Sequence, residues 1–281
     1  MSVFIRLLDP RATLLIASEL VALVRQNLEL IFELTRRELV DRHNAQFLGP
    51  MWILVRPMFV ALLYIFIFAV VFRARVDTGS QLPLDRTAYI LAGILPWLAF
   101  QTSMNQACML VVGNASLLKD FVFQIELLPM ASSLVTVVGQ LLGTLLLLVY
   151  VAVVHHSWYA SWLLLPVLVL LQIMAMVGIA FVLSALTVVV RDVVELVQMF
   201  SMIGVFVSPI VYQPDWVPEA FKPILYANPF SYMVWCYQDV LYYGELTKPL
   251  AWLVFPLLSV GSLILGYRLF RFMKPYFGDF V

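Results

Sequence analysis

The chain has 281 residues, of which 63% are hydrophobic and 12% are charged. Soluble domains contain roughly 45 to 50% apolar and about 25% charged residues, so this composition indicates an integral membrane protein. The length allows about six membrane-crossing helices of roughly 20 residues and one small appendage, and it leaves no room for an ATPase domain. A formal net charge of zero gives no electrostatic reason to expect a nucleic-acid partner.

The two cysteines, Cys108 and Cys236, have neither the number nor the spacing of a disulfide framework or a metal site. Both lie in or beside apolar segments, and we expect them to be buried as small hydrophobic residues. The start of the chain lacks the basic region, single apolar run and small-residue cleavage site of a signal peptide, so we expect it to be retained.

Residues 1–50 form the one long segment that mixes charged with apolar residues, and we expect it to be a cytoplasmic interface segment. From residue 19 to residue 42 the apolar positions recur with the 3.6-residue period of an amphipathic helix. Such a helix lies in the membrane surface and does not cross it. Four arginines place it on the cytoplasmic side by the positive-inside rule: Arg25, Arg36, Arg37 and Arg42. The alternative is a helix that packs on its own transmembrane bundle without a partner.

Six apolar segments follow in the transmembrane part of the chain, residues 51–281. They lie at residues 51–72, 89–112, 127–154, 162–190, 193–211 and 250–272. With both termini in the cytoplasm, twelve basic residues fall on the inner side and five on the outer side, as the positive-inside rule requires. Arg56, near the cytoplasmic end of the first span, can extend to the lipid headgroups.

Two of these spans carry residues that predict helix packing. In the third span Gly139, Gln140 and Gly143 offer a possible close-packing face. Polar side chains in the second span are expected to find partners on neighbouring helices, and a polar stripe along a transport pathway is the alternative. These residues are Gln101, Thr102, Ser103, Asn105 and Gln106.

A short charged insert, residues 113–129, separates the second span from the third. It carries Lys119, Asp120 and Glu126 between apolar positions, and the segments on either side are each long enough to cross a bilayer. We interpret this insert as a cytoplasmic elbow that places a few side chains against a separate motor protein.

Residues 212–249 are too polar for lipid and too apolar for an ordinary loop. Prolines divide the segment, and apolar spacing predicts two helices, residues 218–226 and 231–243, that form a short re-entrant hairpin in the outer leaflet. Ten of the 32 residues from 212 to 243 are aromatic, which favours a gate or a surface on which sugar rings stack. An aromatic belt at the lipid headgroups is the alternative. The candidate residues are Tyr212, Trp216, Tyr226, Tyr232, Trp235 and Tyr237.

The sequence contains no phosphate-binding loop, no H-E-x-x-H metal motif and no nucleophile elbow. No acidic residue lies near the middle of a predicted span, where proton- or sodium-coupled carriers usually have one. Inverted repeats, another mark of such carriers, are not evident. Energy therefore has to come from another subunit, and the elbow is the best place for it to enter.

Several motifs resemble the permease subunits of polysaccharide-exporting ABC transporters. They occur in the same order and spacing over about residues 30 to 250 of this chain. They are RELVDRHNAQFLGPMWILVRP at 37–57, LAGILPWLAF at 91–100, NASLLK at 114–119, LLP at 127–129, SPIVYQPDWVP at 208–218 and NPF at 228–230.

The resemblance implies a homodimeric channel of six helices per subunit in the bacterial cytoplasmic (inner) membrane, bound to two copies of a cytosolic ABC ATPase. ATP and Mg²⁺ would bind to the ATPase, so no cofactor is expected in this chain. The substrate would be an undecaprenyl-pyrophosphate-linked glycan, such as O-antigen, teichoic acid or capsule. The elbow would be the coupling helix, and residues 212–243 would form the periplasmic gate helices.

The resemblance also assigns candidate residues. The expected ATPase contacts are Asn114, Leu117, Leu118, Lys119, Asp120, Phe121, Phe123 and Glu126. The residues that could hold the lipid-linked pyrophosphate are Arg36, Arg37, Arg42 and Arg56, although the positive-inside rule explains the same arginines. One departure concerns Asp120 and Gln124, which stand where the family commonly has a second basic residue and a proline, and this puts the detailed ATPase contact in question.

Two alternative functions remain at the level of sequence. One is a permease for a drug or small lipid within the same superfamily, which less readily explains the aromatic-rich hairpin. The other is a membrane-bound glycosyl or acyl transferase, which needs a paired acid, base or phosphate site. For that chemistry the sequence offers only scattered candidates, namely His43, His155 and Asp239.

Overall fold

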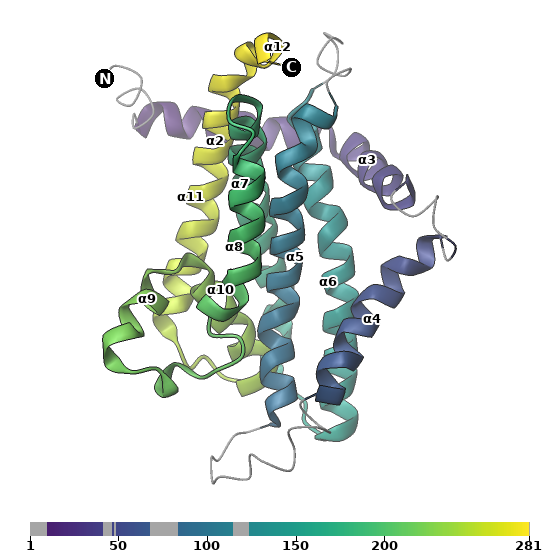
Figure 1. Cartoon of the computed structure of the whole chain (residues 1–281), viewed down its shortest axis with the longest axis vertical. Coiled ribbons are helices and arrows are strands. Elements are labelled where there is room, and N and C mark those ends of the chain that lie inside the picture. Colours follow the sequence, from purple (N-terminus) through teal and green to yellow (C-terminus); the bar gives the residue numbers. More distant parts are fainter. Residues whose placement is uncertain (1–9, 42–46, 48, 68–83, 115–123, 281) are drawn as a thin grey trace.

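The computed structural model describes residues 10–41, 47, 49–67, 84–114 and 124–280, and within these ranges every regular element is a helix (Figure 1). The predicted all-α fold class is confirmed for this part of the chain. The longer helices are α2 (Pro10–Gln26), α3 (Leu28–Asp41), α4 (Trp52–Ile65), α5 (Arg86–Gly113), α6 (Leu127–Val154), α7 (Leu165–Val189), α8 (Val193–Val207), α10 (Pro229–Gln238) and α11 (Pro249–Met273). The shorter ones are η1 (Gly49–Met51), η5 (Ala160–Leu164), η6 (Pro214–Trp216), η7 (Glu219–Phe221), α9 (Lys222–Ala227), η8 (Asp239–Tyr243), η9 (Lys274–Tyr276) and α12 (Phe277–Phe280).

Three of the described helices are long and apolar enough to cross a membrane: Leu127–Val154, Ala160–Val189 and Pro249–Tyr276. The first of them, α6, has the bounds predicted from the sequence. α5 is equally long, with 28 residues, but its polar cluster lowers its hydropathy. These helices run side by side in the bundle (Figure 1).

The two remaining predicted spans correspond to shorter helices. α8 ends at Val207 and not at residue 211, because Ser208 adopts an extended backbone before Pro209. α4 covers Trp52–Ile65 of the predicted first span, and residues 68–72 of that span lie outside the described residues.

The amphipathic segment predicted as one helix from residue 19 to residue 42 consists of two helices in the structure. α2 begins earlier, at Pro10, and the helix bends at Asn27, whose side-chain amide donates to the carbonyl oxygen of Leu23 at 2.8 Å. A side chain that bonds the preceding turn competes with the regular backbone ladder. α2 lies across one end of the bundle and packs against α11, whereas α3 packs against α6 (Figure 1). Both helices therefore rest on the bundle of their own chain.

The centre of the bundle is α5, which contacts α6, α7, α8 and α10. Trp97 of α5 is fully buried and fills the space beside Gly204 of α8, where a Cβ atom would collide with the indole ring. Packing is dense enough here that the site requires glycine.

The closest approach between helix backbones lies between α7 and α11. A Cβ atom on Gly178 would collide with the backbone of Ser262, and one on Gly266 would collide with the carbonyl oxygen of Gly178. The predicted close-packing face on α6 is confirmed at Gly143, where a Cβ atom would collide with the side chain of Leu95 of α5, whereas Gly139 faces open space. The tighter approach between α7 and α11 was not predicted, because several spans contain glycine and only the fold shows which of them meet.

Polar side chains of α5 bond to neighbouring helices. Asn105 Nδ2 donates to Ser201 Oγ of α8 at 3.0 Å, and Ser103 Oγ lies 3.3 Å from Ser133 Oγ of α6. Ser132 of α6 donates to Gln106 Oε1 at 3.4 Å. The interpretation of this cluster as interhelical bonding is confirmed for these residues. Cys108 and Cys236 are buried and free, as predicted.

Residues 212–249 lie at the end of the bundle opposite α2 and α12 (Figure 1). Asn228 Oδ1 accepts from the amide of Phe230 at 3.0 Å and caps α10. Asp239, 1% exposed, accepts from Trp252 Nε1 at 3.0 Å, from the amide of Lys248 at 3.2 Å and from the hydroxyl of Thr247. These bonds fasten α10 and η8 to the start of α11.

Candidate functional site at the elbow end of the bundle

α5 ends and α6 begins at the same end of the bundle as α2 and α12, so the described residues that flank the elbow lie at that end (Figure 1). Asn114 donates from Nδ2 to the carbonyl oxygen of Leu110 at 2.8 Å, and the described chain resumes at Gln124. Of the eight predicted ATPase contacts, Asn114 and Glu126 are therefore described. The others lie outside the described residues: Leu117, Leu118, Lys119, Asp120, Phe121 and Phe123.

Glu126, the last residue before α6, is 6% exposed and accepts from Lys274 Nζ at 2.6 Å through Oε1. A second ion pair joins Arg271 of α11 to Glu19 of α2. Arg271 also lies over the ring of Tyr267, 5.9 Å from its centroid. Together these contacts connect the elbow, the N-terminal helix and the last long helix.

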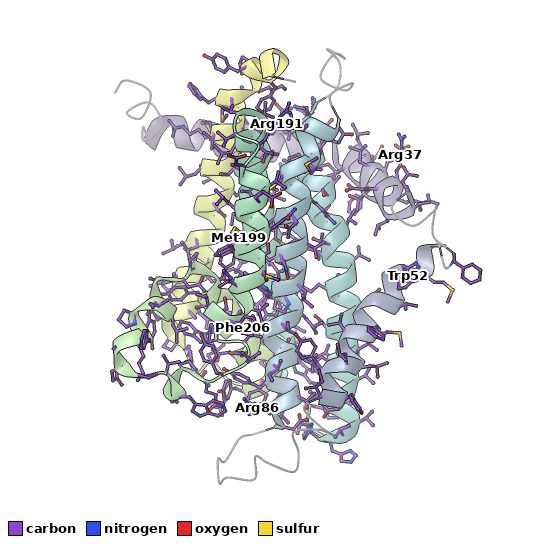
Figure 2. All side chains as sticks on the ribbon, in the orientation of Figure 1. Arg37, Trp52, Arg86, Arg191, Met199 and Phe206 are labelled. Carbon is purple, nitrogen blue, oxygen red and sulfur yellow. The ribbon has the colours of Figure 1, made fainter. Side chains whose placement is uncertain are left out.

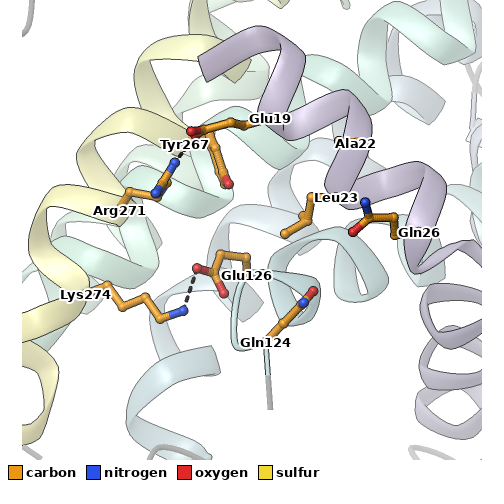
Figure 3. Close-up of a pocket in the computed structure, with 9 residues that line it drawn as sticks. All are labelled: Glu19, Ala22, Leu23, Gln26, Gln124, Glu126, Tyr267, Arg271 and Lys274. Carbon is orange, nitrogen blue, oxygen red and sulfur yellow. Dashed lines mark hydrogen bonds and ion pairs between the residues drawn. The ribbon is translucent and has the colours of Figure 1, made fainter. Parts of the chain in front are cut away.

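A pocket of about 360 Å³ lies between these three elements (Figure 3). The two ion pairs lie on its wall, and the side chains of Gln26 and Gln124 border it as well. Its lining residues are Glu19, Ala22, Leu23, Gln26, Gln124, Glu126, Tyr267, Arg271 and Lys274.

The sequence did not predict that these residues lie around one pocket. Arg271 and Lys274 were counted only among the twelve basic residues of the inner side, and Glu19 was used only as the first residue of the amphipathic segment. Of the two acidic residues, Glu126 is buried and therefore needs a partner, whereas the side chain of Glu19 is half-exposed.

Arg36 and Arg37, two of the four arginines proposed to hold a pyrophosphate, do not line this pocket. Arg36 and Arg37 are exposed on α3, and Arg37 Nε donates to Asp41 Oδ2 at 3.3 Å. Figure 2 shows Arg37 on the outer side of α3, away from the bundle. Arg42 and the side chain of Arg56 lie outside the described residues.

At the opposite end, the candidate aromatic residues divide into two groups. Trp216 and Tyr226 are exposed and Tyr212 is half-buried, and the guanidinium of Arg86 lies 5.0 Å from the ring centroid of Trp216. Tyr232, Trp235 and Tyr237 are buried within this chain.

The charged groups beside the hairpin pack closely against its aromatic rings. Lys248 Nζ lies 4.8 Å from the ring centroid of Trp235. Burial lowers the pKa of Lys248, and the smaller effect of the negative charges of Asp215 and Asp239 is to raise it. This lysine therefore combines a cation–π contact with partial removal from water.

Tyr237 belongs to a buried polar network that joins α10 to α6 and α7. Its hydroxyl donates to Gln172 Oε1 at 2.5 Å and accepts from Gln140 Nε2 at 3.1 Å. Gln140 and Gln172 bond to each other in both directions at 2.8 Å, and Gln172 Nε2 also donates to the carbonyl oxygen of Pro96 at 3.1 Å. Four helices are thus joined by one set of bonds.

Asp85 forms a second junction that the sequence did not reveal. It caps α5 by accepting from the amide of Ala88 at 3.2 Å, and it accepts from the hydroxyl of Tyr150 at 2.6 Å. His155 Nε2 lies 3.0 Å from Asp85 Oδ1. The start of α5 is therefore fixed to the end of α6.

Comparison with known proteins identifies the family of this chain. Residues 29–242, more than half of the chain, match the family described as ABC-2 type transporter. The O-antigen export system permease protein RfbA of Klebsiella pneumoniae is 24% identical over 261 residues, which cover 91% of this chain and 98% of that protein. The protein of the same name from Myxococcus xanthus is 26% identical over 254 residues, which cover 89% and 94%. The resemblance found in the sequence motifs is confirmed, and the chain belongs to the ABC-2 type transporter membrane family.

Proposed function

We propose that this chain is the membrane-spanning subunit of an ATP-driven exporter that moves lipid-linked polysaccharide out of the cytoplasm. The observation that carries the proposal is the similarity, over nearly their whole length, to two proteins named as O-antigen export permeases. The apolar helical bundle supports the same function, because it provides membrane spans. Such a subunit transports its substrate and catalyses no reaction itself.

The assembly that we infer contains two copies of this chain and two copies of a cytosolic ABC ATPase, which binds ATP and Mg²⁺. The six spans are α4, α5, α6, α7, α8 and α11, and both termini lie in the cytoplasm. Arg271 and Lys274 lie beside α2, and Arg191 lies at the same end of the bundle, so this concentration of basic residues supports a cytoplasmic location for that end (Figure 2).

Each end of the bundle has a proposed role. The elbow, residues 113–129, receives the displacement of the ATPase when it binds ATP. Arg36, Arg37, Arg42 and Arg56 hold the pyrophosphate of an undecaprenyl-linked glycan near the cytoplasmic surface. At the outer end, the exposed rings of Trp216 and Tyr226 are available to sugars, while the buried aromatic residues fix the hairpin.

The experiment is deletion of the gene in its own host, followed by complementation. We expect loss of surface glycan, accumulation of the lipid-linked precursor in the cytoplasmic leaflet, and recovery when this chain is expressed again, but no recovery when the gene of its ATPase is deleted as well. Normal surface glycan in the deletion strain would remove the proposal, and export of a drug or a small lipid would support the alternative permease.

A further inference from the structure

A small apolar recess lies against α2, on a different face of that helix from the pocket that Glu19 borders. It has a volume of about 140 Å³, and its walls are Met174 of α7, three aliphatic residues of α11 and three of α2. The backbones of α7 and α11 meet beside it, at Gly178 and Ser262, so these two walls are held rigidly. None of these lining residues has a polar side chain, so the recess fits only an apolar occupant.

The depth of the recess in the membrane can be measured along α11 from Arg271. Arg271 pairs with Glu19 and borders the charged pocket (Figure 3), so it marks the level of the lipid headgroups. Ile264 and Val260, which line the recess, precede Arg271 by about two and three helical turns, or roughly 10 and 16 Å. One leaflet contributes about half of a hydrocarbon core that is roughly 30 Å thick. The recess therefore lies at the depth of the acyl chains of the leaflet at this end of the bundle.

The size of the recess restricts the occupant to a narrow chain. Ligand pockets have volumes of roughly 300 to 1,000 Å³, so a space of about 140 Å³ is too small for a drug-sized molecule, and its apolar walls exclude a sugar. Part of one hydrocarbon chain fits. A polyprenyl chain carries a methyl branch on every isoprene unit, whereas the acyl chain of a phospholipid is unbranched along most of its length. The acyl chain is therefore the better match for a narrow space between helices.

Arg25 of α2 supplies a cation beside the same recess. It follows Val21, which lines the recess and is 50% exposed, by one helical turn, so both side chains lie on the same face of α2. The side chain of Arg25 is exposed and has no ion pair or hydrogen bond among the residues that the structure describes. A guanidinium binds a phosphate through two hydrogen bonds, and its long stem can extend from an apolar surface to the headgroups. The recess and the unpaired cation together match the two ends of a phospholipid.

We propose that this recess binds one acyl chain of an anionic phospholipid, whose phosphate is held by Arg25. Because both termini are proposed to lie in the cytoplasm, the lipid belongs to the cytoplasmic leaflet. It stays bound and is not transported, so the inference does not depend on the substrate of the exporter. The lipid fills the space between α2, α7 and α11 and thereby stabilises the position of the N-terminal helix on the bundle.

The test is native mass spectrometry of the full-length protein after incubation in detergent with equal amounts of phosphatidylglycerol and phosphatidylcholine that carry the same acyl chains. We expect one phosphatidylglycerol to remain bound per chain. Val260→Phe and Val21→Phe fill the recess from α11 and from α2, and each should abolish this retention. Val149→Phe is the matched control, because Val149 is 52% exposed on α6 and lies outside the recess, so this variant should retain the lipid.

The contact with the headgroup is tested in the same assay. Arg25→Gln removes the charge-assisted hydrogen bonds and should lower the preference for phosphatidylglycerol about tenfold. Arg191→Gln is the control, because Arg191 is an exposed arginine at the same end of the bundle (Figure 2), and this variant should keep the preference.

Unchanged retention in both recess variants, or an equal loss in Val149→Phe, would overturn the inference, because the lipid would then be held elsewhere on the apolar surface. An equal effect of Arg25→Gln and Arg191→Gln would overturn the assignment of the phosphate to Arg25. Displacement of phosphatidylglycerol by an equal amount of undecaprenyl phosphate would contradict the choice of a phospholipid and assign the recess to the polyprenyl carrier. None of these measurements involves glycan export, so the proposed function is tested separately.

Discussion

The substitution Tyr237→Phe tests the buried network that holds the outer hairpin to the bundle. It removes one oxygen atom and no other part of the ring. Two hydrogen bonds disappear, at 2.5 Å to Gln172 and at 3.1 Å from Gln140, while the two glutamines still bond to each other. An interhelical hydrogen bond in a membrane protein contributes about 0.6 kcal/mol on average and up to about 1.7 kcal/mol, so we expect a loss of roughly 1 to 2 kcal/mol.

The assay is thermal unfolding of the purified protein in detergent, with the fluorescence of the buried tryptophans as the signal. At about 2 to 4 °C per kcal/mol, the expected decrease in unfolding temperature is roughly 2 to 8 °C. Tyr276→Phe is the control, since Tyr276 is 52% exposed, and it should leave the unfolding temperature unchanged. An unchanged temperature for Tyr237→Phe, or an equal decrease for both variants, would refute the role of the network.

Three further substitutions address other parts of the molecule. Gly178→Ala should destabilise the protein by about 1 to 3 kcal/mol, because the methyl group forces α7 away from α11, whereas Gly261→Ala faces open space and should not; thermal unfolding of the two variants compares them. Arg36→Ala combined with Arg37→Ala should reduce glycan export severalfold without affecting membrane insertion, and normal export would remove these arginines from pyrophosphate binding. Replacing three elbow residues by alanine should abolish both ATPase co-purification and export, and retention of both would show that the elbow does not transmit the motion. These elbow residues are Leu117, Phe121 and Phe123.

The sequence predicted the first and last residues of a helix correctly where neighbouring residues determine them. α6 begins directly after Glu126 and ends before His155, and the apolar run between those polar residues defined both bounds. The division at Asn27 was missed because the apolar period continues through it, and only the structure shows that α2 ends at Gln26 and α3 begins at Leu28. A periodic pattern reports which face of a helix is buried and does not report where its axis turns.

Contacts between distant segments could not be predicted in the same way. Gln140 and Gln172 are 32 positions apart and meet Tyr237 only because α6, α7 and α10 pack together. The pairing of Glu126 with Lys274 likewise spans 148 positions. The sequence shows that such residues are polar and need hydrogen-bond partners. Which of the many possible partners they contact depends on how the helices pack.

The most direct measurement is transport in proteoliposomes that contain this chain with or without its ATPase. A fluorescent undecaprenyl-linked glycan is placed in the outer leaflet, and its arrival inside is followed by protection from an added glycosidase. We predict protection only when both subunits and hydrolysable ATP are present. Protection without the ATPase, or none with the complete complex while the ATPase hydrolyses ATP, would contradict the proposal that this chain is the membrane path of a glycan exporter.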